Sequence, residues 1–193
     1  HRPSQADALH VDFWLGGKNL LRDAGSFSYA SAESAGYFSG TASHNTVQFD
    51  QRDQMPRLSR FLFGAWLKAR DVEPVKQTAD GVTCAAGYRD WQGASHHRAL
   101  TLGRKSLRVV DRVGGFRRGA VLRWRLCPGA QLSGNVVQSE AGNLTVTADV
   151  PIRRIELTSG RESRYYLQTE PIPVLEVELD RPGTLTTEFQ FLP

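Results

Sequence analysis

Short apolar runs separated by turn residues recur along almost the whole chain, and they limit the fold more than any other feature. The runs are rich in Val, Leu, Thr, Phe and Tyr, and Gly, Asp or Pro stands between them. Helical periodicity is nearly absent, whereas this pattern is typical of an antiparallel β-sandwich. We therefore predict an all-β, supersandwich-like fold of two large packed sheets with little or no helix.

The same pattern predicts where the strands lie. The expected strands are Ala8–Leu15, Lys18–Arg22, Thr46–Phe49, Ser59–Phe63, Ala65–Asp71, Glu73–Thr78, Val82–Tyr88, His97–Leu102, Ser106–Val113, Ala120–Leu126, Leu132–Val137, Leu144–Ala148, Ile152–Leu157, Arg164–Gln168, Val174–Leu179 and Thr184–Phe191. We expect a short extended piece at Ser26–Tyr29, a small-residue loop at Ser31–Ser39 and a polar turn at Asp50–Arg57. No linker, repeat or low-complexity tract interrupts the series, so residues 1–193 are expected to form one domain.

Composition excludes several classes of protein. About 40% of the residues are hydrophobic, which is too many for a disordered chain. No apolar run approaches the ~20 residues of a membrane helix, so we expect no membrane insertion. The chain begins without Met and shows no signal peptide, and we expect it to be a fragment of a longer protein.

The formal charge of +4 comes mainly from arginine, which gathers in several short clusters. Arg123 and Arg125 flank Trp124, so in a strand they share one face. These residues form either an ordinary solvated surface or a surface with affinity for a polyanion, because guanidinium pairs well with carboxylates and sulfates. Nucleic acid is not expected as a partner, since no helix-turn-helix, RNP or zinc-finger pattern is present.

The two cysteines, Cys84 and Cys127, lie in strand-like apolar surroundings. A chain with no CxxC and no third thiol does not build a cysteine metal site. We expect free thiols rather than a disulfide.

Candidate functional residues concentrate between Gln5 and Asp50. Asp23 follows an apolar strand and precedes Gly25, a pattern typical of a turn in which the carboxylate accepts backbone N–H groups. His44 stands just before a strand and is, taken alone, typical of a hydrogen-bonded structural residue. Taken together, the two fit a metal site better, since imidazole and carboxylate are common zinc ligands.

Two further histidine groups need interpretation. His10 and Asp12 are two residues apart in an expected strand and so share one face, as metal ligands, as a proton-transfer pair or as the polar side of a half-buried strand. His96 and His97 are adjacent in a strand and face opposite ways, so they are not a chelating pair. The absence of GxSxG, HExxH and a phosphate-binding Gly loop argues against serine hydrolases, zinc proteases and NTPases.

Several segments together resemble the C-terminal domain of the heparinase II/III family of polysaccharide lyases. The resemblance begins with QADAL, LLRDAGSFSY and SHNTVQFD and continues with HHRALTL, LRVVDRVGG, LRWRLCPG and the closing TLTTEFQF. It covers essentially the whole chain, and the first fifty residues carry its specific motifs.

This resemblance implies a larger enzyme that acts on an anionic polysaccharide. Family members carry an N-terminal helical toroid, which this sequence lacks, and the substrate cleft lies between toroid and sandwich. They are bacterial envelope enzymes, periplasmic or secreted, that cleave glycosaminoglycans or exopolysaccharides by β-elimination. One group neutralises the uronate carboxylate, a Tyr or His removes the C5 proton and an acid protonates the leaving oxygen. Without the toroid, the isolated chain is expected to be inactive.

The family's sandwich contributes a His-x-His-x-Asp segment, a separate metal-binding Asp and the His of an HNT motif. These correspond here to the segment's Asp7, to Asp23 and to His44. The catalytic His position holds Pro3 and the metal His position holds Gln5. Since Gln is a poorer zinc ligand than neutral imidazole, the resemblance implies one zinc or another divalent cation at Gln5, Asp23 and His44, or a site that has lost it.

His10 and His1 are the candidates for the missing imidazole roles, including the catalytic one. No organic cofactor is expected. The enzyme interpretation predicts a polar, Arg-lined groove near Asp23 and His44. The alternative is a non-catalytic glycan-binding or structural sandwich with a degenerate site, which the loss of both motif histidines favours.

Overall fold

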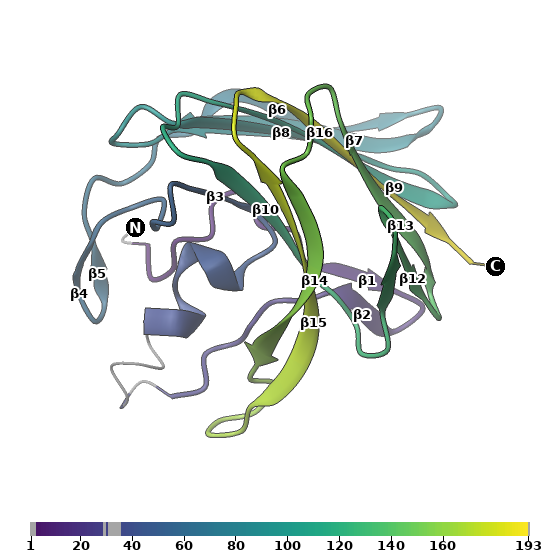
Figure 1. Ribbon diagram of the computed structural model, residues 1–193, viewed down its shortest axis with the longest axis horizontal. Helices are drawn as coiled ribbons and strands as arrows, with labels where there is room; N and C mark the ends of the chain where they lie inside the picture. Colours follow the sequence, from purple (N-terminus) through teal and green to yellow (C-terminus); the bar gives the residue numbers. More distant parts are fainter. Residues whose placement is uncertain (1–2, 29, 31–35, 193) are drawn as a thin grey trace.

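The computed structural model describes residues 3–28, 30 and 36–192, and it is an antiparallel β-sandwich (Figure 1). An eight-stranded sheet packs against a four-stranded sheet, and two small hairpins lie beside them. The prediction of an all-β sandwich is therefore confirmed.

The large sheet holds, in spatial order, β11 (Gln131–Ser133), β12 (Val136–Ser139), β13 (Gly142–Ala148), β16 (Gly183–Phe191), β9 (Ser106–Gly114), β8 (Ser95–Leu102), β7 (Gly81–Arg89) and β6 (Arg70–Thr78). The small sheet holds β14 (Arg154–Glu162), β15 (Glu170–Leu179), β10 (Ala120–Arg125) and β3 (Val47–Phe49). The hairpins pair β1 (Phe13–Leu15) with β2 (Lys18–Leu21), and β4 (Arg57–Ser59) with β5 (Leu62–Phe63). A 3₁₀ turn, η1 (Thr41–Ser43), precedes β3, and residues 36–38 form a helical turn.

The main core lies between the two sheets. Trp124 in β10 is fully buried, and its indole N–H donates to Thr187 Oγ1 of β16 across the sandwich at 3.0 Å. Leu122 and Leu175 of the small sheet pack in the same cluster as Leu144 and Leu185 of the large sheet. Burial of these apolar side chains, at about 25 cal/mol per Å², supplies the main force that holds the sheets together.

One predicted strand near the N-terminus is mostly irregular. The expected strand Ala8–Leu15 is shortened to Phe13–Leu15, because Leu9 has a φ of 63°. A left-handed residue cannot continue an extended strand. The interpretation of His10 and Asp12 as neighbours on one strand face is therefore wrong.

Two further predictions fail before β6. In place of the expected strand Ser59–Phe63 the chain forms the β4–β5 hairpin, and in place of Ala65–Asp71 it runs irregularly up to β6. Ala65 and Asp71 have φ values of 45° and 49°, which an unbroken strand does not allow. The expected strand Glu73–Thr78 forms the second part of β6.

Two later predictions are also wrong. Within Leu132–Val137, Gly134 has a φ of 61° and turns the chain between β11 and β12. Arg164–Gln168 belongs to no strand and contains Leu167 at a φ of 61°. The other expected strands each overlap one observed strand.

Two short segments differ from strands in other ways. The described part of Ser26–Tyr29 belongs to no strand, and residues 31–35 of the expected loop Ser31–Ser39 lie outside the described residues.

Cys84 and Cys127 are free thiols, as expected. Within the described part of the chain, no helix is long and apolar enough to cross a membrane.

Candidate metal centre

Three segments that are distant in sequence meet where the edge of the small sheet approaches the N-terminal region. His10 follows the left-handed Leu9, and its own N–H donates to the Asp7 carbonyl at 2.9 Å. Asp23 lies just after β2, and His44 lies between η1 and β3. The sequence placed Asp23 and His44 at the ends of regular elements, and the structure agrees.

Asp23 and His44 form the centre of this cluster. Asp23 Oδ1 accepts the Gly25 N–H at 2.6 Å, which is the predicted turn, while Oδ2 lies 3.0 Å from His44 Nδ1. His10 Nε2 lies 3.6 Å from the same Oδ2. One potential ligand atom from each of the three residues lies within 4.8 Å of the other two. We call His10, Asp23 and His44 the triad.

Burial and close contacts shift the pKa values of His10 and Asp23. Burial and the nearby His44 lower the pKa of His10 to about 4, so His10 is a neutral imidazole at pH 7. Burial acts to raise the pKa of Asp23, but the hydrogen bonds from His44 and from the Gly25 N–H help to outweigh it and hold this pKa below its usual value. An ionised carboxylate beside neutral imidazole is the protonation state that binds divalent cations.

The hydrogen bonds of the two imidazoles are different. His44 Nδ1 faces the ionised Asp23 carboxylate and donates to it, and His44 Nε2 is buried without a hydrogen-bond partner. In His10, Nδ1 accepts the Asn45 N–H at 2.9 Å, which places the proton of the neutral ring on Nε2. His10 Nε2 is likewise buried without a hydrogen-bond partner.

These donors fit a divalent cation in part. Two ligands of a tetrahedral zinc, each at 2.0–2.2 Å, lie roughly 3.4 Å apart, close to the separations of 3.0 and 3.6 Å seen here. Asp23 can bind a cation through Oδ2, whereas His44 can bind one through Nδ1 only after it loses the proton that it donates to Asp23. His10 can bind a cation through Nε2 only if its proton moves from Nε2 to Nδ1, which breaks the hydrogen bond from the Asn45 N–H.

Asn45, the middle residue of the HNT motif, holds the triad segments together. Its side-chain N–H groups donate to the carbonyls of Val11 at 2.8 Å and Arg22 at 3.1 Å, and its Oδ1 accepts the Arg125 N–H at 2.6 Å. With the bond to His10, this one buried residue contacts both flanks of the triad and the small sheet. The motif identified His44 alone, and the structure adds Asn45.

Arg98 supports the triad from the large sheet. Its Nη1 donates to the carbonyls of Leu9 and Asn45, both at 2.6 Å, next to His10 and His44 in the chain. Its Nε and Nη2 bind the buried Asp111, which also contacts His96 at 2.6 Å. Sequence reasoning missed this network, although the alternation of polar and apolar residues around Asp111 placed a carboxylate on the inward face of a strand.

The other predicted site residues lie around the triad or outside the described residues. Gln5 lines a narrow pocket of about 100 Å³, together with Gly25, Phe38, Arg60 and Phe61. Gln5 therefore lies near Gly25, two residues after Asp23 in the chain, in a pocket that Arg60 also lines. His1 lies outside the described residues. His96 and His97 face opposite ways, as expected, and His96 is buried against Asp111.

The comparisons with known proteins agree with this architecture. A family model described as "Heparinase II/III-like, C-terminal" matches residues 1–172. The chain superposes on heparinase III, the BT4657 gene product, with a TM-score of 0.82 and 18% identity, covering 97% of this chain and 30% of that one. It superposes on the heparan sulfate lyase HepC from Pedobacter heparinus with a TM-score of 0.78 and 18% identity, covering 98% and 31%. No curated protein matches the chain.

Proposed function

Because the chain belongs to the heparinase II/III-like C-terminal family, we propose that it is the sandwich domain of a polysaccharide lyase. The chain spans about 30% of the length of the solved structures it matches, so the proposed enzyme includes further domains, the family's helical toroid among them. Its substrate is an acidic, uronate-containing polysaccharide, which it cleaves by β-elimination. The sandwich contributes one wall of the cleft and a metal-type site.

The observation that carries this proposal is the convergence of the triad. Asp23, His44 and His10 come from three segments, and two buried imidazole nitrogens within the triad lack partners. Burying polar atoms without partners costs free energy, and such atoms are common at sites that receive a ligand. A divalent cation held there would supply positive charge that offsets a uronate carboxylate.

The protein's own residues prepare the site in three ways. The low pKa of His10, about 4, keeps this ring neutral, and Asp23 stays ionised. Asn45 and Arg98 fix the backbone on both sides of the imidazoles. The narrow pocket lined by Gln5, Gly25 and Arg60 opens beside Asp23 and is a suitable place for an anionic sugar substituent.

A proton-abstracting role for His10 finds less support. The Asn45 amide occupies its Nδ1 lone pair, and the proton on Nε2 leaves no free lone pair in this arrangement. The catalytic role of His10, like that of His1, stays a prediction.

The test is a calorimetric titration of the chain with zinc after treatment with a chelator. We expect about one zinc per chain, with affinity reduced at least tenfold in His44→Ala and Asp23→Asn, since loss of a ligand removes a direct metal bond. His97→Ala, which changes a histidine on the outer face of the large sheet, is the matched control and should bind as the wild type does. Equal affinity in all four proteins contradicts the metal site.

The second candidate function is a non-catalytic glycan-binding sandwich. It is favoured because both carboxylate oxygens of Asp23 already have hydrogen-bond partners within the protein, in His44 and Gly25. The two functions differ in their product: a lyase forms an unsaturated uronate that absorbs ultraviolet light. An enzyme that joins this sandwich to its helical domain should produce that absorbance from acidic polysaccharide, whereas a binding module leaves the polymer uncut.

A further inference from the structure

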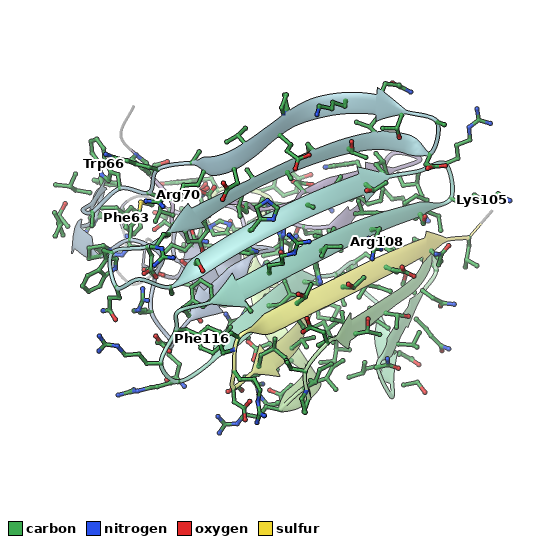
Figure 2. The ribbon with its side chains drawn as sticks, turned by 90° about the horizontal axis from the view of Figure 1, so that it is seen from above. Phe63, Trp66, Arg70, Lys105, Arg108 and Phe116 are labelled. Carbon is green, nitrogen blue, oxygen red and sulfur yellow. The ribbon has the colours of Figure 1, made fainter. Side chains whose placement is uncertain are left out.

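A hollow of about 320 Å³ lies on the outer face of the large sheet, away from the triad. Strand pairing sets Arg70 of β6 opposite Gly87 of β7, then His97 of β8, then Arg112 of β9. Residues paired directly across antiparallel strands share one face of a sheet, so these four form one row. Figure 2 looks onto this face, with Arg70 toward one end and Arg108 toward the other.

Gly87 forms the floor of the hollow. A Cβ at this position would lie 3.0 Å from the His96 carbonyl oxygen and 3.3 Å from two atoms of the His97 side chain. Glycine therefore leaves open the space between Arg70 and His97 that any other residue would fill. Arg89 and Ser95 form the next row along the strands and complete one wall.

The hollow carries a concentrated positive charge. Arg70, Arg89 and Arg112 are exposed, and among the residues that the structure describes none of the three makes an ion pair. Of the lining residues, Asp71 alone carries a carboxylate. Clefts lined by charge of one sign attract counter-ions strongly.

Two arginines elsewhere on the molecule are paired with carboxylates. Arg108, four residues before Arg112 on the same face of β9, pairs with Glu188 at 3.4 Å. In the small sheet, Arg123 pairs with Glu176 at 2.7 Å. Arg104, Arg117, Arg118 and Arg164 also make no ion pair among the described residues. What distinguishes the hollow is therefore that three unpaired guanidinium groups gather around Gly87.

We infer that this hollow binds carboxylate or sulfate groups of an acidic polysaccharide. Planar guanidinium groups match both anions with paired hydrogen bonds. The lining holds no exposed Phe, Tyr or Trp ring, because Tyr88 is buried, and single-stranded nucleic acid is held largely by stacking on aromatic rings. The lining therefore favours a glycan over a nucleic acid.

The hollow is separate from the triad. His96, Arg98 and Asp111 point inward and reach the triad segments, so His97 and Arg112, one residue further along their strands, point outward. The two sites thus lie on opposite faces of the large sheet. A polymer bound in the hollow stays near the enzyme without occupying its cleft. The inference rests on the proposed function only for the class of polymer.

The experiment titrates the 193-residue chain calorimetrically with a heparan sulfate oligosaccharide of defined length, at low and at moderate salt. We expect Arg89→Ala and Arg112→Ala each to weaken binding about fivefold, and the double variant about 25-fold, as for exposed charge pairs whose effects add. Arg108→Ala is the matched control, with the same residue type on the same strand and face, and should change affinity less than twofold. Substitution of exposed side chains leaves the fold intact, which thermal melting checks.

Three results overturn the inference. They are the absence of binding, equal losses for Arg108→Ala and Arg112→Ala, and tighter binding of single-stranded DNA than of the oligosaccharide at equal charge. His44→Ala separates this inference from the proposed function. The His44→Ala variant should lose zinc and keep its affinity for the oligosaccharide. If the wild-type chain binds the oligosaccharide but no zinc, the hollow stands and the metal site is contradicted. If the wild-type chain binds zinc but Arg112→Ala shows no specific loss of oligosaccharide binding, the metal site stands and the hollow is contradicted.

Discussion

Arg98 is the residue on which the geometry of the triad depends most. It is buried, pairs with Asp111 through two nitrogens and lies 5.0 Å above the Trp124 ring. Its remaining terminal nitrogen donates to the Leu9 and Asn45 carbonyls. Only the flat, multiply donating guanidinium can serve all these acceptors at once, so lysine is not an equivalent replacement.

We predict that Arg98→Met lowers the free energy of unfolding by about 3–5 kcal/mol, because it leaves the Asp111 carboxylate buried without its main counter-charge. The hydrogen bond from His96 persists and does not replace that charge. Urea unfolding measures the effect. Arg108→Met, at an exposed pair with Glu188, is the control and should cost at most about 1 kcal/mol. Equal costs for the two variants would show that Arg98 contributes only as a surface charge does.

The sequence could identify the motif residues but not their supports. Asp23 and His44 stand in recognisable motifs, and their proximity could be predicted from them. His10 occupies no motif position, and it reaches the triad because Leu9 turns the chain in a left-handed conformation. The roles of Asn45 and Arg98 depend on which backbone carbonyls face them, and this information arises only from tertiary packing.

At the scale of elements, the long central strands could be predicted well and the irregular segments could not. Strands β7 to β10 follow apolar periodicity closely, since both edges of each are paired and register is fixed by the buried face. Most of the errors fall where non-glycine residues adopt positive φ, at Leu9, Ala65, Asp71 and Leu167, and one falls at Gly134. The strand-like sequence around these residues hides turns that tertiary contacts impose.

Leu167 offers a direct test of this explanation. It is 60% exposed between β14 and β15, with a φ of 61°. Leu167→Gly removes the energetic cost of a residue with a Cβ in the left-handed conformation, and it sacrifices little buried apolar surface. We therefore predict that the free energy of unfolding rises by about 0.5–1 kcal/mol. Val75→Gly, at an exposed residue within β6, should lose about the same amount. Thermal melting of the isolated chain distinguishes the two signs, and a loss in both variants would contradict strain at Leu167.

At the scale of the whole molecule, exposed apolar side chains gather beside the triad. Phe61, which is 60% exposed, lines the same pocket as Ser28. Ser28 Oγ lies 3.3 Å from the hydroxyl of Tyr166, and Tyr165 and Tyr166 are both more than 60% exposed. Exposed large apolar side chains that lie near one another are common at interaction sites. In the proposed lyase, the helical domain covers this surface and encloses the cleft.

This arrangement predicts how the complete enzyme unfolds. In an enzyme that joins the sandwich to its helical domain, Phe61→Ser combined with Tyr165→Ser should divide a single thermal transition into two, because buried apolar contacts couple the domains. The same double variant of the isolated chain should melt within a few degrees of the wild type, since it loses little buried surface. Val75→Ser, an exposed apolar residue on β6, is the control and should leave the single transition intact. Calorimetry of the three full-length proteins and the two isolated chains decides the matter: if the double variant keeps a single transition, the helical domain docks elsewhere than on Phe61 and Tyr165.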